Sequence, residues 1–425
     1  MKRIHTILII LLLAVTYGEA KRSSDDRQMD DFITSLMKKM TLEEKIGQLN
    51  LGGVGSPKVV GSAIGLDEAI RKGLVSSVGG FDAKAAEDAQ KFAVENSRMK
   101  IPLITGLDVV HGYYTIFPIP LASACSWNMP LLEESARVAA DEASAFGINW
   151  TFAPMVDICR DPRWGRIAEG AGEDPCLGSR IGRAMVRGFQ GDDLSKPNTL
   201  LACVKHFALY GASEAGRDYN TVSMDPVTMY NYYLPPYKAA FDEGAGSGMT
   251  SFNVVNGVPA TGNKWLLTDL LRDQWKFKGF MVSDANSLAE MSEHGMGGAQ
   301  RITELAMNAG LDMDMSSSLY VLCLKKAVEE KRVPLSRIDA ACRRVLEAKY
   351  KLGLFEDPFR YLKNKQRQSQ VLSPQNRDVA RRLAAESIVL LKNSEQLLPI
   401  TPPRKIAVVG PMGNVRGELL GTWSY

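Results

Sequence analysis

The sequence predicts an α/β protein: a (β/α)8 TIM-like barrel followed by the start of a second α/β sandwich domain. Eight short apolar runs alternate with longer segments of helical periodicity over roughly 300 residues. The runs are apolar throughout, which indicates parallel strands covered on both faces. A further apolar run follows a polar stretch near residue 405, which indicates another unit. Eight strands fit a barrel better than an open sheet, although alternation does not exclude a doubly wound sheet.

The elements of the barrel domain, residues 28–355, follow in order. Residues 29–49 predict two helices, with Thr41 and Glu44 as a capping box between them. The predicted strands are residues 48–55, 74–80, 102–110, 149–158, 200–207, 248–257, 279–285 and 310–317. The predicted helices are residues 86–96, 131–147, 180–191, 229–245, 265–275, 299–310 and 319–333.

The N-terminus predicts a signal peptide, residues 1–20. Lys2 and Arg3 precede the apolar run 7–15, and small residues surround a cleavage site after Ala20. The run is short for a membrane span, so an uncleaved anchor is the alternative. We expect a periplasmic or secreted protein with no membrane contact after cleavage.

The C-terminal part predicts a linker and a second domain. Residues 356–385 are polar and are interpreted as the linker. Residues 376–393 predict an amphipathic helix, and residues 405–411 a buried strand. A lone strand leaves the backbone N–H and C=O groups along its edges without hydrogen-bond partners. Residues 386–425 are therefore expected to be the start of a truncated α/β sandwich domain.

Composition narrows the classes of partner. A formal net charge of +3 with scattered basic residues gives no sign of a nucleic-acid partner. Four His without clustering predict no metal site, and we expect no cofactor. Six Cys without CxxC spacing do not form a disulfide scaffold, although a Cys159–Cys176 bridge stays open. The sequence does not predict an oligomeric state.

Polar side chains accumulate where the predicted strands end. In a (β/α)8 barrel, catalytic residues come from these ends. Taken singly, each has a structural interpretation: Asp284 suits a helix N-cap, and residues 205–206 suit a buried ion pair. Their accumulation at one rim favours a site instead. The strand-end residues are Asp108, His111, Asp157, Arg166, Glu169, Lys205, His206, Ser251, Asn253, Ser283, Asp284, Asp312 and Asp314.

The residue types favour a sugar ligand. The sequence shows no serine nucleophile elbow and no phosphate-binding P-loop, which makes a phosphorylated substrate a weak alternative. Carboxylates with Lys, His and Arg suit a ligand that carries many neutral hydroxyls. A carboxylate among them can attack an anomeric carbon.

Several long motifs resemble glycoside hydrolase family 3, and within it the bacterial periplasmic β-glucosidase type. They are "GLDVVHGYYTIFPIPLASACSWN", "FAPMVDICRDPRWGRIAEGAGEDP", "KHFALYGASEAGRDYN", "GFMVSDANSLAEM", "AGLDMDM" and "AAESIVLLKNSEQLLPI". The resemblance implies an exo-acting retaining β-glucosidase that releases terminal β-D-glucosyl residues from an oligosaccharide or β-glucoside. It implies Asp284 as nucleophile. The implied substrate-binding residues are Asp108, Arg166, Lys205, His206, Ser251 and Phe252.

The sequence departs from the family pattern in two places. Ala285 follows the implied nucleophile where many members carry a large residue. The glucosidase acid/base is a Glu of the second domain, which we expect to be missing here. The run "KHFALYG" lacks the second His of the N-acetylglucosaminidase branch, which argues against that activity. A β-xylosidase, or an inactive fragment that binds sugar weakly, are the alternatives.

Overall fold

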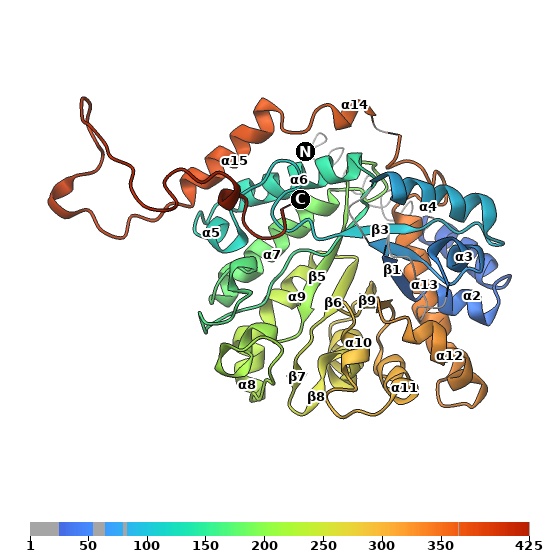
Figure 1. Ribbon diagram of the computed structural model, residues 1–425. Helices are drawn as coiled ribbons and strands as arrows, with labels where there is room; N and C mark the ends of the chain where they lie inside the picture. Colours follow the sequence, from blue (N-terminus) through green and yellow to red (C-terminus); the bar gives the residue numbers. More distant parts are fainter. Residues whose placement is uncertain (1–24, 54–63, 80–82, 364, 425) are drawn as a thin grey trace, which may run out of the picture.

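A computed structural model of the protein describes residues 25–53, 64–79, 83–363 and 365–424. Eight parallel strands form one sheet in the order β10-β1-β2-β3-β4-β5-β6-β9 (Figure 1). Val282 in β9 pairs with Met313 beside β10, and the Met313 amide donates to the Met281 carbonyl at 2.9 Å. This pairing closes the sheet and confirms the predicted barrel. The strands are β1 Asn50–Gly53, β2 Ser77–Gly79, β3 Ile104–Leu107, β4 Trp150–Thr151, β5 Leu201–Phe207, β6 Ser247–Thr250, β9 Phe280–Val282 and β10 Asp314–Met315; β7 Val254–Val255 and β8 Val258–Pro259 form a separate hairpin.

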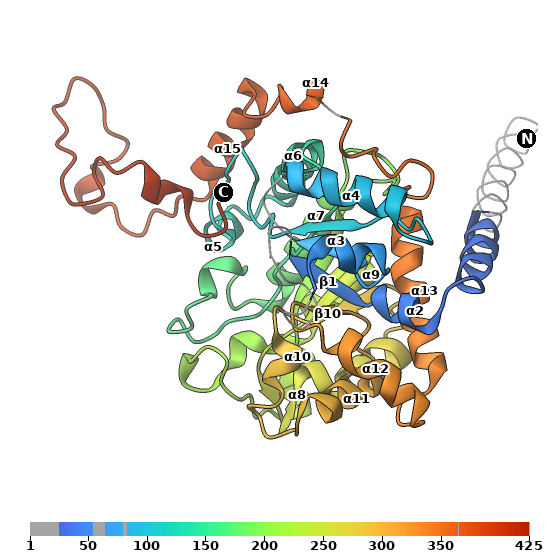
Figure 2. The ribbon, with the colours of Figure 1, turned by 45° about the vertical axis from the view of Figure 1, so that its right-hand side comes forward.

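Helices surround the strands (Figure 2). Residues 25–37 are helical and contact α13, where Arg343 bonds Asp30 at 2.7 Å. The others are α2 Leu42–Gly47, α3 Leu66–Arg71, α4 Ala83–Asn96, α5 Pro120–Ala124, α6 Met129–Ala145, α7 Pro175–Gln190, α8 Pro226–Thr228, the π-helix η4 Met229–Tyr233, α9 Pro235–Asp242, the π-helix η6 Trp265–Gln274, α10 Ser287–Glu290, α11 Ala299–Ala309, α12 Leu319–Glu329, α13 Leu335–Lys351, α14 Lys365–Gln368 and α15 Pro374–Glu386.

Local sequence explains these elements. All seven residues of β5 are buried, as expected for a strand with one face in the barrel and the other under helices. The predicted capping box of α2 is confirmed, because Thr41 and Glu44 each bond the other's backbone amide. Gly188 lets α7 approach α6 closely, since an added Cβ would lie 2.5 Å from the Cβ of Ala136.

The segment predicted as a linker contains helices that pack on the barrel. Val379 and Leu383 of α15 are buried against Phe117, Leu131 and Leu132. This contact explains why α15 lies along α6 in both views (Figures 1 and 2). The predicted amphipathic helix is confirmed up to Glu386, where α15 ends before the apolar stretch.

The predicted buried strand at 405–411 is wrong. Its apolar side chains are open to solvent, with Ile406 66%, Val408 76% and Val409 84% exposed. No described strand runs beside them, so their backbone groups have no ladder to join. After α15 the chain runs away from the barrel and then returns toward it (Figure 1).

The remaining predictions concern the signal peptide, the ends of two strands, membrane-spanning segments and one disulfide bridge. The signal peptide, and the ends of the first two predicted strands at 54–55 and 80, lie outside the described residues. Within the described part, no helix has the length and apolar character needed to cross a membrane. The Cys159–Cys176 bridge is absent, because both thiols are free.

Candidate active site

The predicted site residues meet at the carboxyl ends of the barrel strands. Asp108 follows β3, Lys205 and His206 lie at the end of β5, and Asp284 follows β9. Arg166 comes from the long loop after β4. Parallel strands bring these ends to one rim, where the five side chains lie as two contacting sets that meet at the adjacent residues Lys205 and His206.

The first ion pair joins neighbouring strand ends. Lys205 Nζ lies 2.6 Å from Asp108 Oδ1. The Lys205 side chain is 2% exposed and that of Asp108 is 21% exposed. A buried ammonium needs such a partner, because an unpaired charge there would be costly. The carboxylate stays accessible to a ligand.

The second ion pair forms within the loop after β4. The short helix η1, Ile167–Glu169, places Glu169 three residues after Arg166. Arg166 Nε donates to one Glu169 oxygen at 2.7 Å, and Nη2 donates to the other at 2.9 Å. Burial raises the Glu169 pKa, but the hydrogen bonds from Arg166 and the charges of Lys205 and Arg166 together outweigh it and hold that pKa below its usual value. Both groups therefore stay charged.

His206 connects the ion pairs to the end of β9. Its Nε2 lies 3.0 Å from Arg166 Nη2 and 3.5 Å from Asp284 Oδ2. Its Nδ1 lies 3.0 Å from Asp157 Oδ2. Burial, and then the charges of Arg166 and Lys205, hold the pKa of His206 well below its usual value. The imidazole is therefore neutral.

Asp284 presents one free oxygen to this cluster. Its Oδ1 accepts from the Ala285 amide at 2.7 Å, whereas its buried Oδ2 has no hydrogen-bond partner among the described residues. Burial raises the pKa of Asp284 to about 7, against the opposing charges of Arg166 and Lys205. The predicted helix-cap role is wrong: the residue before α10 is Asn286, which makes no side-chain cap bond.

The remaining predicted site residues differ in environment. Ser251 is fully buried, and its hydroxyl donates to the Ala208 carbonyl at 3.2 Å, which is a structural contact. Phe252 packs against the rings of Tyr210 and Tyr219, with centroids 5.8 and 4.7 Å away. Tyr219 is 48% exposed, so these rings form an aromatic wall that reaches solvent.

Two strand-end carboxylates, Asp312 and Asp314, lie outside the cluster. Asp312 bonds Arg272 and Arg344 of the surrounding helices at 2.6 and 2.7 Å. Asp314 accepts from the Ser317 hydroxyl at 2.7 Å. Both carboxyl oxygens of Asp312 and of Asp314 accept hydrogen bonds, whereas Asp284 Oδ2 has no partner among the described residues.

The structure adds one residue that the sequence did not indicate. Trp423 comes from the far end of the chain, and its ring centroid lies 5.0 Å from Lys205 Nζ. Glu169 was among the strand-end residues, but its pairing with Arg166 was not predicted. The neighbouring Thr422 carbonyl accepts a hydrogen bond from His111 Nε2.

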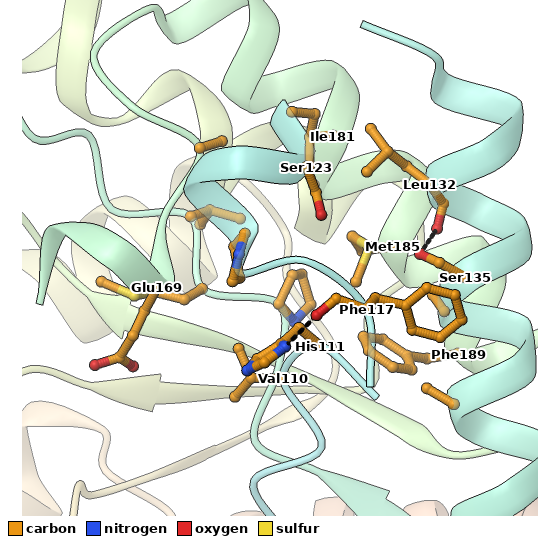
Figure 3. Close-up of a pocket in the computed structure, with 18 of the residues that line it drawn as sticks. Val110, His111, Phe117, Ser123, Leu132, Ser135, Glu169, Ile181, Met185 and Phe189 are labelled. Atoms are coloured by element: carbon orange, nitrogen blue, oxygen red, sulfur yellow. Dashed lines mark hydrogen bonds between the residues drawn. The ribbon is translucent and has the colours of Figure 1, made fainter. Parts of the chain in front are cut away.

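An apolar pocket adjoins the cluster between α5, α6 and α7 (Figure 3). Leu132, Met185 and Phe189 line one side of it, and Glu169 lies at the other, with its carboxylate pointing away from them. Asp108, Lys205, His206 and Asp284 do not line it. The pocket therefore borders the charged cluster without being part of it. Among the described residues, no group of three or more His, Cys, Asp or Glu is placed to hold a metal ion.

The barrel, with carboxylates and fixed cations at the carboxyl ends of its strands, is typical of (β/α)8 hydrolases that act on sugars. Residues 41–348 match the glycosyl hydrolase family 3 N terminal domain. The chain therefore belongs to glycosyl hydrolase family 3.

Relatives support this assignment. The chain is 42% identical over 404 residues to the periplasmic beta-glucosidase of Salmonella typhimurium, covering 93% of this chain and 52% of the relative. It is 32% identical to a putative beta-xylosidase of Formosa agariphila, covering 93% of this chain and 56% of that protein. The crystal structure of a beta-glucosidase from Listeria innocua with isofagomine superposes with a TM-score of 0.87 at 41% identity, covering 93% of this chain and 56% of that one. The chain thus spans about half the length of these relatives.

Proposed function

We propose that the intact protein is an exo-acting, retaining β-glucosidase with Asp284 as its nucleophile. One observation carries the proposal: Asp284 Oδ2 is buried, has no partner among the described residues and lies 3.5 Å from His206 Nε2. An oxygen without a hydrogen bond is the one best prepared to attack an anomeric carbon. The names of the Salmonella and Listeria relatives support the glucoside as substrate.

The reaction proceeds in two displacements. Asp284 Oδ2 bonds to the anomeric carbon while the bond to the leaving oxygen breaks, and that oxygen takes a proton from the general acid. Water then attacks the same carbon and gives a proton to the group that acted as general acid, while the bond to Asp284 breaks; this restores the original configuration. The cations of Arg166 and Lys205 favour the ionised nucleophile before each turnover.

The other cluster residues bind the sugar. Asp108 offers a partly exposed carboxylate to hydroxyl donors, and Arg166, Lys205 and His206 surround the same space. Phe252 supplies an apolar ring at the wall. Ser251 lies behind this surface, where its hydroxyl donates a hydrogen bond to the Ala208 carbonyl.

The general acid/base is assigned to a second α/β domain that begins at residues 386–425. Supporting this, Glu169 is occupied by Arg166 through two hydrogen bonds and is poorly suited to donate a proton. Apolar side chains such as Leu391 (91% exposed) and Val409 (84% exposed) would be covered by such a domain. The 425-residue chain by itself is then expected to bind sugar weakly and turn it over slowly. Calorimetric titration with glucose, together with an activity assay, tests this; hydrolysis at the rate of a β-glucosidase with both domains would contradict it.

The nucleophile is tested by replacing Asp284 with Ala in the intact protein. Turnover of an aryl β-glucoside should be lost, and azide should restore cleavage with an α-glucosyl azide product, because azide attacks from the face that Asp284 occupied. Asp314→Asn is the matched control, since it changes another buried strand-end carboxylate outside the cluster. Undiminished turnover by Asp284→Ala would refute the assignment.

A β-xylosidase is the second candidate, since relatives such as the putative beta-xylosidase of Formosa agariphila carry that name. Paired measurements of kcat/KM on aryl β-glucoside and aryl β-xyloside decide between the two. The predicted signal peptide supports a periplasmic or secreted location, which fractionation of expressing cells tests.

A further inference from the structure

A chain of three oxygens lies behind His206, on the side away from Asp284. Asp157 Oδ1 is 2.5 Å from the Tyr237 hydroxyl, and that hydroxyl is 2.8 Å from the His206 carbonyl oxygen. Asp157 is 2% exposed and Tyr237 is fully buried. Buried polar groups of this kind are hydrogen-bonded in nearly every case. The protons at these atoms can therefore be assigned by counting donors and acceptors.

Arg166 fixes the protonation of the imidazole. A guanidinium has donors and no acceptor. Its Nη2 has two protons, of which one goes to Glu169 at 2.9 Å and the other faces His206 Nε2 at 3.0 Å. Nε2 must therefore be the acceptor. The ring proton of a neutral imidazole is then on Nδ1, which donates to Asp157 Oδ2 at 3.0 Å.

Asp157 Oδ2 cannot accept a further hydrogen bond. It also accepts from the backbone amide of His206 at 2.8 Å. An Asp carboxyl oxygen has two lone pairs, and both are now used. Any additional proton on Asp157 must lie on Oδ1, the oxygen next to Tyr237.

The Tyr237 hydroxyl has one proton for two neighbouring oxygens. If Asp157 were ionised, the Tyr237 proton could be donated to only one of the two oxygens, Asp157 Oδ1 or the His206 carbonyl. The other close contact would then place two oxygen lone pairs against each other with no proton between them. With a proton on Oδ1, Asp157 donates to Tyr237 and Tyr237 donates to the carbonyl. Every contact is then a hydrogen bond.

We propose that Asp157 is a neutral carboxylic acid in mildly acid solution and that, with Tyr237, it holds His206 in its Nδ1-protonated tautomer and so acts as a positioning residue for the nucleophile. Its catalytic meaning rests on the proposed function. Nε2 then has no proton to give Asp284 Oδ2, which lies 3.5 Å away. A hydrogen bond from Nε2 would stabilise the carboxylate and make it a weaker nucleophile.

The groups that face Asp157 favour this proton in mildly acid solution. Burial is the largest influence and raises the pKa of Asp157 to about 6. The hydrogen-bond contacts with Tyr237 and the His206 amide and the charge of Arg166 favour ionisation, and the charge of Glu169 opposes it. The nearby Cys159 thiol is neutral, because burial raises its pKa to about 11.

The proton and the tautomer can be measured without substrate, at about pH 5, where a group of raised pKa keeps its proton. The chain has four His, so ¹⁵N-histidine spectra can be assigned with His111→Gln and His294→Gln. His206 should be protonated at Nδ1, in the wild type and in Asp157→Asn alike. The infrared difference between these proteins should contain a carboxylic-acid C=O band, and Tyr237→Phe should shift that band. A missing acid band, or a proton on Nε2, would overturn the proposal.

Kinetics give a second readout. In Asp157→Asn the amide oxygen can accept both His206 protons and the amide N–H can donate to Tyr237, so kcat/KM should fall by about threefold at most. Asp157→Ala leaves two buried N–H groups without partners and should lose about 30-fold or more. Equal losses in the two variants would overturn the neutral-acid assignment. If Asp157→Ala does not fold, the infrared measurement decides. Because the spectra use the free protein, their failure is separate from a failure of the proposed glucosidase activity.

Discussion

The charge of Arg166 should set the pH at which Asp284 becomes active. Arg166 Nη2 lies 3.0 Å from His206 Nε2, which lies 3.5 Å from Asp284 Oδ2. The two charges are therefore separated by no more than the sum of these distances. At that separation and an effective dielectric constant of about 20, their attraction is about 2.5 kcal/mol. Arg166→Met removes this attraction and disfavours the ionised nucleophile.

The expected result is a shift of the acid limb of the kcat/KM profile. In the proposed mechanism activity needs ionised Asp284, so kcat/KM should rise as pH increases through the Asp284 pKa of about 7. In Arg166→Met the midpoint should move to higher pH by about two pH units, or by about one if Glu169 takes up a proton in response. The variant also loses sugar contacts, but this loss lowers kcat/KM at every pH and leaves the midpoint in place.

Arg163→Met is the matched control. Arg163 lies in the same loop, but its side chain is 69% exposed and pairs with Asp161. Its removal should leave the midpoint where it is in the wild type. A midpoint that stays unchanged in Arg166→Met, or that moves equally in both variants, would refute the proposed action of Arg166 on Asp284.

Three further predictions concern stability. Asp312→Ala leaves the buried Arg272 without its carboxylate and should lower the free energy of unfolding by about 3–5 kcal/mol in urea titrations; adding Arg272→Met should restore part of the loss, and a drop below about 1 kcal/mol would contradict the ion-pair account. Gly188→Ala should cost about 1–3 kcal/mol, seen as a lower thermal midpoint, because the new Cβ would lie 2.5 Å from that of Ala136; an unchanged midpoint would show that α6 and α7 can separate freely. Burial lowers the pKa of Lys349 to about 7 from 10.5, so the unfolded chain binds more protons between these values and wild-type stability should rise with pH across that window. Lys349→Met should remove the rise; an identical pH dependence in both proteins would contradict it.

The barrel could be predicted because its strands are buried on both faces. Burial of this kind leaves a continuous apolar run, such as β5, that is visible in the local sequence. Closure could not be predicted in the same way. It depends on the pairing of Val282 with Met313, and no local pattern carries that contact. The error at residues 405–411 has the same origin, since apolar composition gives strand propensity but supplies no neighbouring strand.

The position of the site could also be predicted, because a strand end is a position in the sequence. Asp108, Lys205 and Asp284 each follow or end an apolar run, and the structure places them at one rim. Contacts between residues far apart in the sequence could not be predicted. Tyr237 occupies an apolar position of helix α9, where its ring is expected and its hydroxyl has no signal. The family resemblance implied that Ser251 binds substrate, yet its hydroxyl donates to the carbonyl of Ala208, directly after β5.

The arrangement of charges explains why Asp284 differs from its neighbours. Lys205 balances Asp108, and Arg166 balances Glu169, each through bonds of 2.9 Å or less. Each of these carboxylates has a cation in direct contact, whereas Asp284 has no dedicated cation in contact among the described residues. Burial then raises its pKa to about 7, and Oδ2 receives no hydrogen bond from the described residues.

An anomeric carbon that develops positive charge would supply the missing cation at the moment of reaction. The free carboxylate is thus complementary to the transition state more than to the neutral ground state, which is the condition for catalysis by differential binding. A neutral His206 preserves this difference. A protonated imidazole at 3.5 Å would stabilise Asp284 equally before and during the reaction, and would leave less stabilisation for the transition state.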